Sequence, residues 1–317
     1  VESKLAWLLK IWKLYSPLRF LAPYIWKNMD LSGYDLVIAS SSWYITRGFK
    51  VGPDTKVICY CHTPPRYLYG YETSIDLQKY FLVRVYAVIV NHFLRLFDFE
   101  SAQKVDQFVV NSRNVQQRVE KFYRKSSVIV YPPIETKKFT EAAEGEKKDD
   151  YFLIVSRLVG AKGLEQAARA AKKLKFKLKI AGGEAGYSDV ATKLKRLGGE
   201  MVELLGRVSE ETLVRLYARA KGFIALAREE DFGMTVVEAM AAGTAVIAFN
   251  GGGFRETVKE GEGGILIDDT SEEAIEEGIR RFNKIKWNRR KIMEWAKRFD
   301  RKEFERGIKK VVNDLVR

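Results

Sequence analysis

Six short apolar runs in the middle of this chain restrict its fold more than any other feature. They lie at 151–156, 177–182, 201–206, 222–227, 245–249 and 263–267. Helical patterns at 163–174, 188–197, 209–219 and 234–242 separate the first five runs. Short apolar strands that alternate with helices predict a parallel sheet with right-handed crossovers. Residues 140–296 are therefore predicted to form one doubly wound domain, and its first residues, 140–150, have the composition of a linker.

The first segment of the chain repeats this pattern with fewer units. Strand candidates lie at 34–40, 56–61, 107–112 and 127–132, with helical stretches around 75–104 and 113–124. The proline pairs Pro64-Pro65 and Pro132-Pro133 are expected to end the strands before them. Residues 1–139 are predicted to form a second α/β domain.

The length and composition fit a soluble, two-domain globular protein. The chain has 317 residues, of which 46% are hydrophobic and 30% charged, and it shows no apolar run or leader pattern typical of a membrane span or signal peptide. Cys59 and Cys61 point to the same side of a strand, so a disulfide between them is not expected. We therefore expect a reducing, cytoplasmic setting. The run CYCH contains His62, but the only other histidine is His92, so a zinc site is not expected.

The net charge of +14 is unevenly distributed. Residues 1–139 hold 20 basic and 11 acidic side chains, residues 140–283 hold 22 and 25, and residues 284–317 hold 13 and 5. A basic surface fits nucleic acid, anionic lipid or an acidic substrate, and equally a solvated helix face. Near the start, Trp7, Trp12 and Tyr15 alternate with Lys10 and Lys13. A basic helix of this kind can lie on anionic lipid or pack as core.

Two carboxylates flank the stretch EDFGMTVVE near the carboxyl end of the fourth apolar run. Glu230 is predicted in the loop between strand and helix, and Glu238 about one turn into a helix that opens near Met234. Loops at the carboxyl ends of strands bind ligands in open α/β sheets, and free amides at a helix start attract anions. A ligand that is part polyol and part phosphate, such as a nucleotide sugar, fits this arrangement.

With these residues and the context FGMTVVEAMAAGTAVIA, the chain resembles the retaining glycosyltransferases of family 4, whose donor-site motif is Glu-x7-Glu. The resemblance implies that Glu230 contacts hydroxyls of the donor sugar and Glu238 the nucleotide ribose. The backbone amides that would face the sugar and diphosphate belong to Phe232, Gly233, Met234 and Thr235.

Further residues match the family's donor site. In SRLVGAKG, Arg157 and Lys162 match the cations that hold the donor diphosphate, and their charge would stabilise the departing diphosphate. The loops GGE (182–184) and LGRVS (205–209) resemble the border of the nucleobase pocket, with Gly183, Arg207 and Val208. The match includes no Asp-x-Asp metal motif, so no metal ion and no cofactor are expected.

The string CHTPPRYLYGY (61–71) resembles mannosyltransferase-like members of the family. There the histidine lies near the donor sugar and the acceptor, which assigns His62 a hydrogen-bonding or proton-handling role. Arg66 and Tyr67 follow on the acceptor side. A histidine held by a backbone carbonyl in a turn is the alternative.

The resemblance implies two facing Rossmann-like domains, the GT-B fold class. Domain 1–139 would be joined by a returning C-terminal helix, 297–317, and would pair with domain 140–296. The usual first strand, glycine-rich loop and helix find no match, so we expect an N-terminal lobe that lacks its first βα units. That gap leaves acceptor binding and turnover open.

The implied function is retaining, metal-independent transfer of a hexose from a nucleoside diphosphate sugar to a hydroxyl acceptor. GDP-mannose is the first donor candidate and a UDP-sugar the second. A lipid-linked or cell-surface glycan is the candidate acceptor, and the expected location is cytoplasmic, with peripheral contact to an anionic inner membrane face. The alternatives are a truncated paralogue that binds nucleotide sugar without turnover, a non-hydrolysing epimerase, and a basic nucleic-acid-binding α/β protein.

Overall fold

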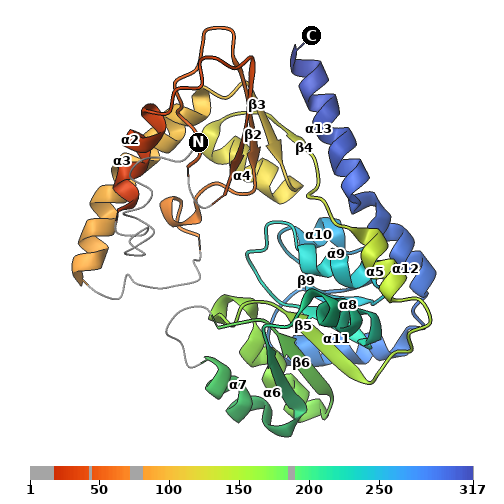
Figure 1. Ribbon diagram of the computed structural model, residues 1–317. Helices are drawn as coiled ribbons and strands as arrows, with labels where there is room; N and C mark the ends of the chain where they lie inside the picture. Colours follow the sequence, from red (N-terminus) through yellow and green to blue (C-terminus); the bar gives the residue numbers. More distant parts are fainter. Residues whose placement is uncertain (1–17, 43–44, 72–80, 185–189, 317) are drawn as a thin grey trace. The chain divides into compact units, whose positions relative to one another are not determined.

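The computed structural model describes residues 18–42, 45–71, 81–184 and 190–316. The chain divides into two compact units, Val1–Val130 with Ile308–Arg317, and Tyr131–Gly307 (Figure 1). Each unit is described below by itself. The domain limits predicted from the sequence, 1–139, 140–296 and 297–317, stay a prediction.

The second unit contains a six-stranded, fully parallel sheet. Its strand order is β10-β9-β8-β5-β6-β7. The strands are β5 (Tyr151–Val155), β6 (Lys177–Ala181), β7 (Val202–Gly206), β8 (Gly222–Ala225), β9 (Val246–Phe249) and β10 (Gly264–Ile267). All six predicted strands are confirmed, and the order is that of a dinucleotide-binding Rossmann sheet.

Helices of the second unit form two packed groups, as a doubly wound sheet requires. One group contains α6 (Leu164–Leu174), α7 (Val190–Gly198) and α11 (Glu272–Lys284). The other contains α5 (Thr136–Ala142), α8 (Glu210–Arg219), α9 (Met234–Ala241) and α12 (Arg289–Ala296). The predicted linker at 140–150 therefore begins inside α5, whose Phe139 packs into the core.

Local sequence explains where these helices begin and how closely they pack. The Ser209 and Ser271 hydroxyls accept hydrogen bonds from backbone N–H groups of the first turns of α8 and α11, which satisfies an otherwise unpaired donor. A side chain at Gly222 of β8 would come within 2.6 Å of Phe282 and 2.8 Å of Phe152. The sheet and α11 can approach this closely only because that position has no Cβ.

Shorter elements complete the second unit. They are α10 (Phe254–Thr257) and the 3-10 turns η3 (Gly160–Lys162), η4 (Gly199–Met201) and η5 (Lys297–Phe299). Helix α13 (Arg301–Val316) ends the described chain and confirms the helix expected at 299–312.

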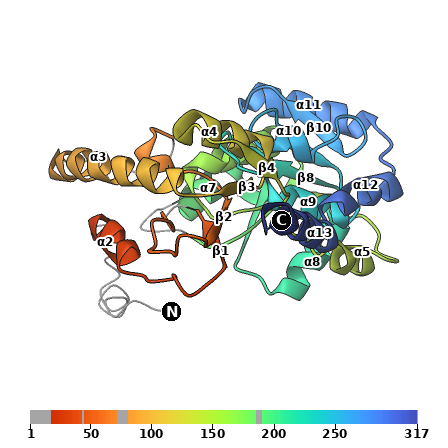
Figure 2. The ribbon, with the colours of Figure 1, turned by 90° about the horizontal axis from the view of Figure 1, so that it is seen from above.

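The first unit contains a four-stranded parallel sheet in the order β1-β2-β3-β4. The strands are β1 (Leu36–Ser41), β2 (Lys56–Cys61), β3 (Gln107–Val110) and β4 (Ser127–Ile129). The helices and turns are η1 (Arg19–Leu21), α2 (Ala22–Lys27), η2 (Arg66–Leu68), α3 (Phe81–Gln103) and α4 (Arg113–Tyr123). The N-terminal part of α3 extends beyond the strands of this sheet (Figures 1 and 2).

A buried ion pair lies in the core of the first unit. The Arg47 guanidinium donates to the Asp98 carboxylate, and both side chains are almost completely buried. Hydroxyls of Tyr69 and Tyr123 donate to the other oxygen of Asp98, at 2.7 and 2.9 Å. Burial raises the pKa of Asp98, while the Arg47 charge and these hydrogen bonds oppose that rise. The network joins the 45–50 loop, α3 and α4.

Cys59 and Cys61 lie on β2, the predicted strand, and both are free, buried thiols. Burial raises the pKa of Cys59, which is typical of an unreactive structural cysteine. The predicted basic-aromatic helix with Trp7, Trp12 and Tyr15 lies outside the described residues. Across the described ranges, no helix is both long enough and apolar enough to cross a membrane.

Candidate functional site

The candidate site of the second unit lies where the order of strand addition in its sheet reverses. Strands β5 and β8 are neighbours, but the chain continues from β5 towards β6 and from β8 towards β9. The loops that follow these two strands therefore separate, and they leave a crevice at the carboxyl edge of the sheet, where open α/β sheets bind ligands. The first loop carries Arg157 and Lys162, and the second carries Glu230.

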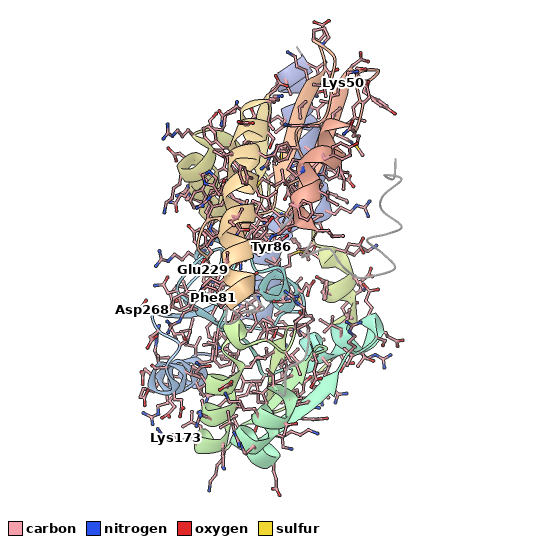
Figure 3. All side chains as sticks on the ribbon, turned by 90° about the vertical axis from the view of Figure 1, so that its left-hand side faces the viewer. Lys50, Phe81, Tyr86, Lys173, Glu229 and Asp268 are labelled. Carbon is pink, nitrogen blue, oxygen red and sulfur yellow. The ribbon has the colours of Figure 1, made fainter. Side chains whose placement is uncertain are left out.

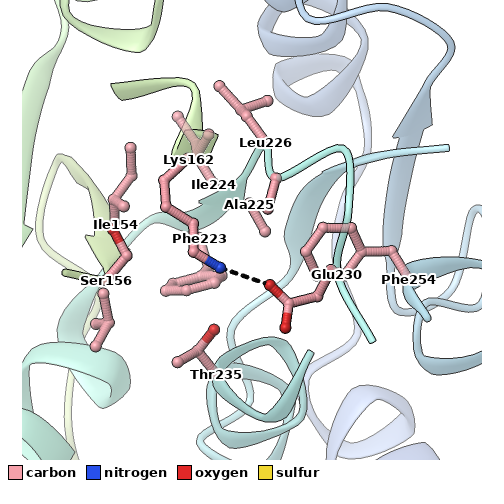
Figure 4. Close-up of a pocket in the computed structure, with 12 residues that line it drawn as sticks. Ile154, Ser156, Lys162, Phe223, Ile224, Ala225, Leu226, Glu230, Thr235 and Phe254 are labelled. Carbon is pink, nitrogen blue, oxygen red and sulfur yellow. Dashed lines mark hydrogen bonds and ion pairs between the residues drawn. The ribbon is translucent and has the colours of Figure 1, made fainter. Parts of the chain in front are cut away.

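A pocket opens at this position (Figure 4). The ends of β5 and β8 and the ring of Phe254 give it apolar walls, and its polar groups come from Ser156, Lys162, Glu230 and Thr235. The structure thus brings together three of the predicted residues, Lys162, Glu230 and Thr235. Ser156 and Phe254 were not predicted. Ser156 directly precedes Arg157 in the loop that was singled out, but no sequence signal marks Phe254.

An ion pair crosses the pocket. Lys162 Nζ donates to Glu230 Oε2 at 2.8 Å, and the two side chains are 29% and 24% exposed. Figure 4 shows this contact bridging the two loops. Because both groups retain solvent access, a ligand can reach either one. A lysine and a carboxylate together offer donors for an anion and acceptors for hydroxyl groups.

Two glycines allow close packing at the base of this crevice, where the β5 loop meets the β8 loop and the β8 loop meets α10. Gly163 has φ 67° as the N-cap of α6, and a Cβ there would lie 2.6 Å from Leu226 Cβ. Gly233 has φ 93° at the N-cap of α9, and a Cβ there would lie 2.7 Å from the Phe254 ring. Only glycine satisfies both the left-handed backbone and the lack of space.

The backbone of Glu230 is fixed by the glycine run that follows β9. The Gly253 N–H donates to the Glu230 carbonyl at 2.9 Å. A Cβ at Gly252, where φ is 53°, would lie 2.3 Å from the same carbonyl oxygen. The run GGG (251–253) therefore holds the loop that presents the Glu230 carboxylate.

The loops after β5, β6 and β7 are joined by backbone hydrogen bonds. The Gly182 N–H donates to the Gly206 carbonyl at 2.7 Å, and the Leu158 N–H donates to the Gly183 carbonyl at 3.0 Å. A Cβ at Gly183 would lie 2.7 Å from Nε of Arg207, so the predicted pair lies in contact. Val208 follows in the same loop and is half-buried, and Arg157 is exposed beside Leu158.

Glu238 lies one turn into α9, as predicted, and its carboxylate meets α8. The Tyr217 hydroxyl donates to Glu238 Oε2 at 2.7 Å. Burial raises the pKa of Glu238, and the hydrogen bond from Tyr217 opposes that rise. Glu238 is not among the residues that line the pocket of Glu230. Phe232 is buried before the helix, and Met234 is exposed at its start.

The remaining predicted residues belong to the first unit. His62 follows β2, and its Nε2 lies 3.0 Å from the Ser40 Oγ. The Asn111 side chain donates to the His62 carbonyl at 2.9 Å, and the Tyr60 ring meets the imidazole edge to face at 4.9 Å between centroids. Three neighbouring strand ends thus hold His62 in place. The sequence analysis does not identify Ser40. The serine run SSS at 40–42 is the sequence feature that could have indicated it.

Arg66 and Tyr67 form the start of η2. The Arg19 guanidinium lies 4.9 Å from the centre of the Tyr67 ring, and the Asn91 side chain donates to the Tyr67 carbonyl at 3.3 Å. Tyr67 therefore has a packing role in its unit, and the acceptor-side role of both residues stays a prediction. Within the described residues there is no group of three or more His, Cys, Asp or Glu able to hold a metal ion.

Comparisons with known proteins identify the family of this chain. Residues 135–299, which are 165 of the 317 residues, match the family model "Glycosyl transferases group 1". Residues 4–138 match the model "Glycosyltransferase Family 4". Together the two matches extend over nearly the whole chain and support the resemblance predicted from the donor-site motif.

Individual relatives share only about a quarter of their aligned residues with this chain. An uncharacterized glycosyltransferase of Methanocaldococcus jannaschii is 25% identical over 66% of this chain and 60% of its own length. The alpha-1,3/1,6-mannosyltransferase ALG2 of Dictyostelium discoideum is 26% identical over 80% of this chain and 67% of its own length. The chain thus spans about two thirds or less of these curated relatives.

A solved structure resembles the whole described fold. The sucrose-phosphate synthase of Thermosynechococcus elongatus superposes with a TM-score of 0.67 at 18% identity, covering 90% of this chain and 74% of that chain. This likeness and the two parallel sheets confirm the predicted fold class, an α/β protein of GT-B type with two Rossmann-like units.

Proposed function

Because the chain belongs to the glycosyl transferases group 1 family, we propose that it moves a hexose from a nucleoside diphosphate sugar to a hydroxyl acceptor. The observation that carries this proposal is the Lys162–Glu230 pair, which lies between β5 and β8, where the strand order of the six-stranded sheet reverses. A cation and a carboxylate side by side match the two ends of an activated sugar. The diphosphate needs positive charge, and the sugar offers hydroxyl groups.

Lys162 and Arg157 bind the diphosphate in this proposal, and Glu230 accepts hydrogen bonds from sugar hydroxyls. During transfer the bond between the anomeric carbon and the diphosphate oxygen breaks, and the acceptor oxygen bonds to that carbon. The acceptor proton leaves with the diphosphate, whose added negative charge is stabilised by the two cations and by amides at the start of α9, including that of Thr235.

The nucleoside end of the donor follows the same edge of the sheet. Glu238 accepts hydrogen bonds from the ribose hydroxyls, and Tyr217 orients its carboxylate. The loop that contains Gly183 and the loop with Arg207 and Val208 border the base. His62, oriented by Ser40, acts on the acceptor side as a hydrogen-bond donor or a proton carrier.

Several finer features belong to the proposal. Transfer retains the anomeric configuration and needs no metal ion. GDP-mannose is the first donor candidate, supported by the mannosyltransferase relative, and a UDP-sugar is the second. A lipid-linked or cell-surface glycan is the proposed acceptor, because the first segment and the C-terminal helices carry the basic excess.

The test is a panel of nucleotide sugars that is assayed for binding by calorimetry and for hydrolysis or transfer by chromatography, with and without EDTA. One preferred donor and turnover in EDTA would support the proposal. Binding without turnover would favour a nucleotide-sugar-binding paralogue. Failure of every nucleotide sugar to bind, together with salt-dependent binding of random DNA, would favour the nucleic-acid alternative.

A further inference from the structure

Helix α3 of the first unit carries an apolar stripe on its outer face. Seven of its apolar side chains are exposed: Phe81 66%, Val85 42%, Val88 66%, Ile89 55%, Phe93 66%, Leu96 50% and Phe99 37%. Apart from the neighbours Val88 and Ile89, successive members are three or four residues apart, which places the row along one side of the helix. Isolated exposed apolar residues are ordinary, but a row over about five turns marks a surface that binds something.

The opposite side of α3 is already occupied by its own unit. Ala87, Leu94, Phe97 and Asp98 are buried there, and Leu94 and Phe97 belong to a core cluster with Ile45 and Leu68. The helix is therefore apolar on both sides, a pattern that normally indicates burial on both sides. The described residues of the first unit cover only one of these two sides.

Exposed arginines border one edge of the stripe. Arg84 and Arg95 are exposed and eleven residues apart, so they share one edge. On the other edge Tyr86 lies 5.8 Å from the guanidinium of Arg19. Glu100 is the single acidic side chain exposed on this helix among the described residues. An apolar row bordered by exposed arginines is the pattern of helices that lie flat on anionic lipid.

We propose that the outer stripe of α3 docks this protein on an anionic lipid bilayer, with the helix parallel to the membrane plane. The apolar side chains enter the boundary between head groups and acyl chains, while Arg84 and Arg95 extend to the lipid phosphates. Figure 3 shows this side of α3, with Phe81 and Tyr86 labelled near its N-terminal end.

Charge distinguishes this occupant from a second copy of the chain. Two copies that met along the stripe would bring Arg84 and Arg95 of each against a unit with the same basic excess, 20 basic and 11 acidic residues over 1–139. Like charges at an interface are unfavourable. An anionic bilayer supplies the opposite charge. The N-terminal part of α3 also extends beyond its sheet (Figure 2).

The test is flotation of the full chain with vesicles of pure phosphatidylcholine and of equimolar phosphatidylcholine and phosphatidylglycerol. The wild type should bind the anionic vesicles at least about tenfold better, since each basic side chain near such a surface contributes a factor of about five. Val88→Glu with Phe93→Glu should lower binding about tenfold or more, because two charges would enter the apolar layer. Val128→Glu, 42% exposed on β4 of the same unit, is the matched control and should bind like the wild type.

The rim is tested with Arg84→Gln and Arg95→Gln against Lys56→Gln, an exposed lysine of the same unit. Only the arginine variant should lose its preference for anionic vesicles. Circular dichroism and nucleoside diphosphate binding report folding, and neither depends on transfer activity. Three results would overturn the proposal: no vesicle binding by the wild type, unchanged binding by Val88→Glu with Phe93→Glu, or a dimer in sedimentation velocity that this variant dissociates without a change in vesicle binding.

Discussion

Lys162 and Glu230 lie 68 residues apart in the sequence and 2.8 Å apart in the pocket. At an effective dielectric near 20, two unit charges at 4 Å attract by roughly 4 kcal/mol before screening and desolvation. An anionic ligand has to compete with Glu230 for the lysine. The pair therefore keeps the lysine in place. It also lowers the affinity for a nucleoside diphosphate that carries no sugar, because this ligand must displace Glu230 from the lysine.

This competition gives the two residues opposite effects on binding. Lys162→Ala should weaken nucleoside diphosphate binding about tenfold or more, because a charge-assisted hydrogen bond contributes about 1.5–3 kcal/mol. Glu230→Gln should bind the same diphosphate at least as tightly as the wild type, yet lose about 100-fold in transfer because the sugar is misplaced. Calorimetry and a transfer assay measure both effects. Lys173→Ala, which breaks an ion pair with Glu276, is the control and should keep normal diphosphate affinity. Unchanged diphosphate affinity in Lys162→Ala would show that Lys162 does not bind the diphosphate.

Glu238 predicts a dependence of stability on pH. Burial raises its pKa above the ordinary 4.5, so the unfolded chain releases this proton first as the pH rises. The free energy of unfolding therefore falls between pH 4.5 and the higher pKa of the folded state, and this loss persists above it. Below pH 4.5 the carboxyl is protonated in both the folded and the unfolded state, so its ionisation does not lower the free energy of unfolding.

Glu238→Gln removes this ionisation. From pH 4 to pH 7 its melting temperature should rise relative to that of the wild type, while donor binding weakens about tenfold because the amide accepts fewer hydrogen bonds from hydroxyls. Melting curves at the two pH values measure the first effect, and calorimetry measures the second. A melting difference that stays constant across this range would contradict the raised pKa.

At the scale of elements, contact between the β5 and β8 loops depends on Gly163. Gly163→Ala should cost the left-handed backbone energy of about 1–2 kcal/mol and in addition force Leu226 away, for about 1–3 kcal/mol more. The shift would separate Lys162 from Glu230 and weaken diphosphate binding. Denaturant unfolding and calorimetry measure the two effects.

Gly199→Ala separates strain from steric overlap. Gly199 has φ 57°, close to the 67° of Gly163, but a Cβ there meets nothing within 4 Å. This variant should show only the backbone cost and keep normal diphosphate affinity. If both variants lost the same stability and affinity, the contact with Leu226 would have no role in the site.

The strands of the second unit were predictable because a parallel strand buried on both faces leaves a continuous apolar run. β5 and β8 show this, with YFLIV and GFIA. The loop positions of Lys162 and Glu230 followed from these strands and from the family motif. Their direct pairing did not, because a contact between residues 68 positions apart leaves no local pattern.

Other features were missed for the same reason. Tyr217 reaches Glu238 from the preceding helix, and Arg47 reaches Asp98 from 51 residues away. Periodicity records which side of an element is apolar, but tertiary packing decides which polar groups meet. The outer stripe of α3 shows the same limit. Its apolar residues were visible in the sequence, but only the structure separates the buried side from the exposed one.

At the scale of the whole molecule, the two units have separate cores. One cluster surrounds Leu153 and Ile247 in the second unit, and another surrounds Cys59 and Phe108 in the first. The first unit also depends on the buried pair of Arg47 and Asp98. Removing one partner of a buried pair costs about 3–5 kcal/mol, because the other charge stays buried.

Asp98→Asn should therefore destabilise the first unit selectively. Scanning calorimetry should show one transition lowered by about 10 °C or more, while a nucleoside diphosphate raises only the other, because a ligand stabilises the unit that binds it. Asp30→Asn breaks an exposed pair with Lys50 in the same unit and should leave both transitions in place, since exposed pairs contribute little. A single transition that Asp98→Asn and the diphosphate shift together would show that the two units unfold as one cooperative body.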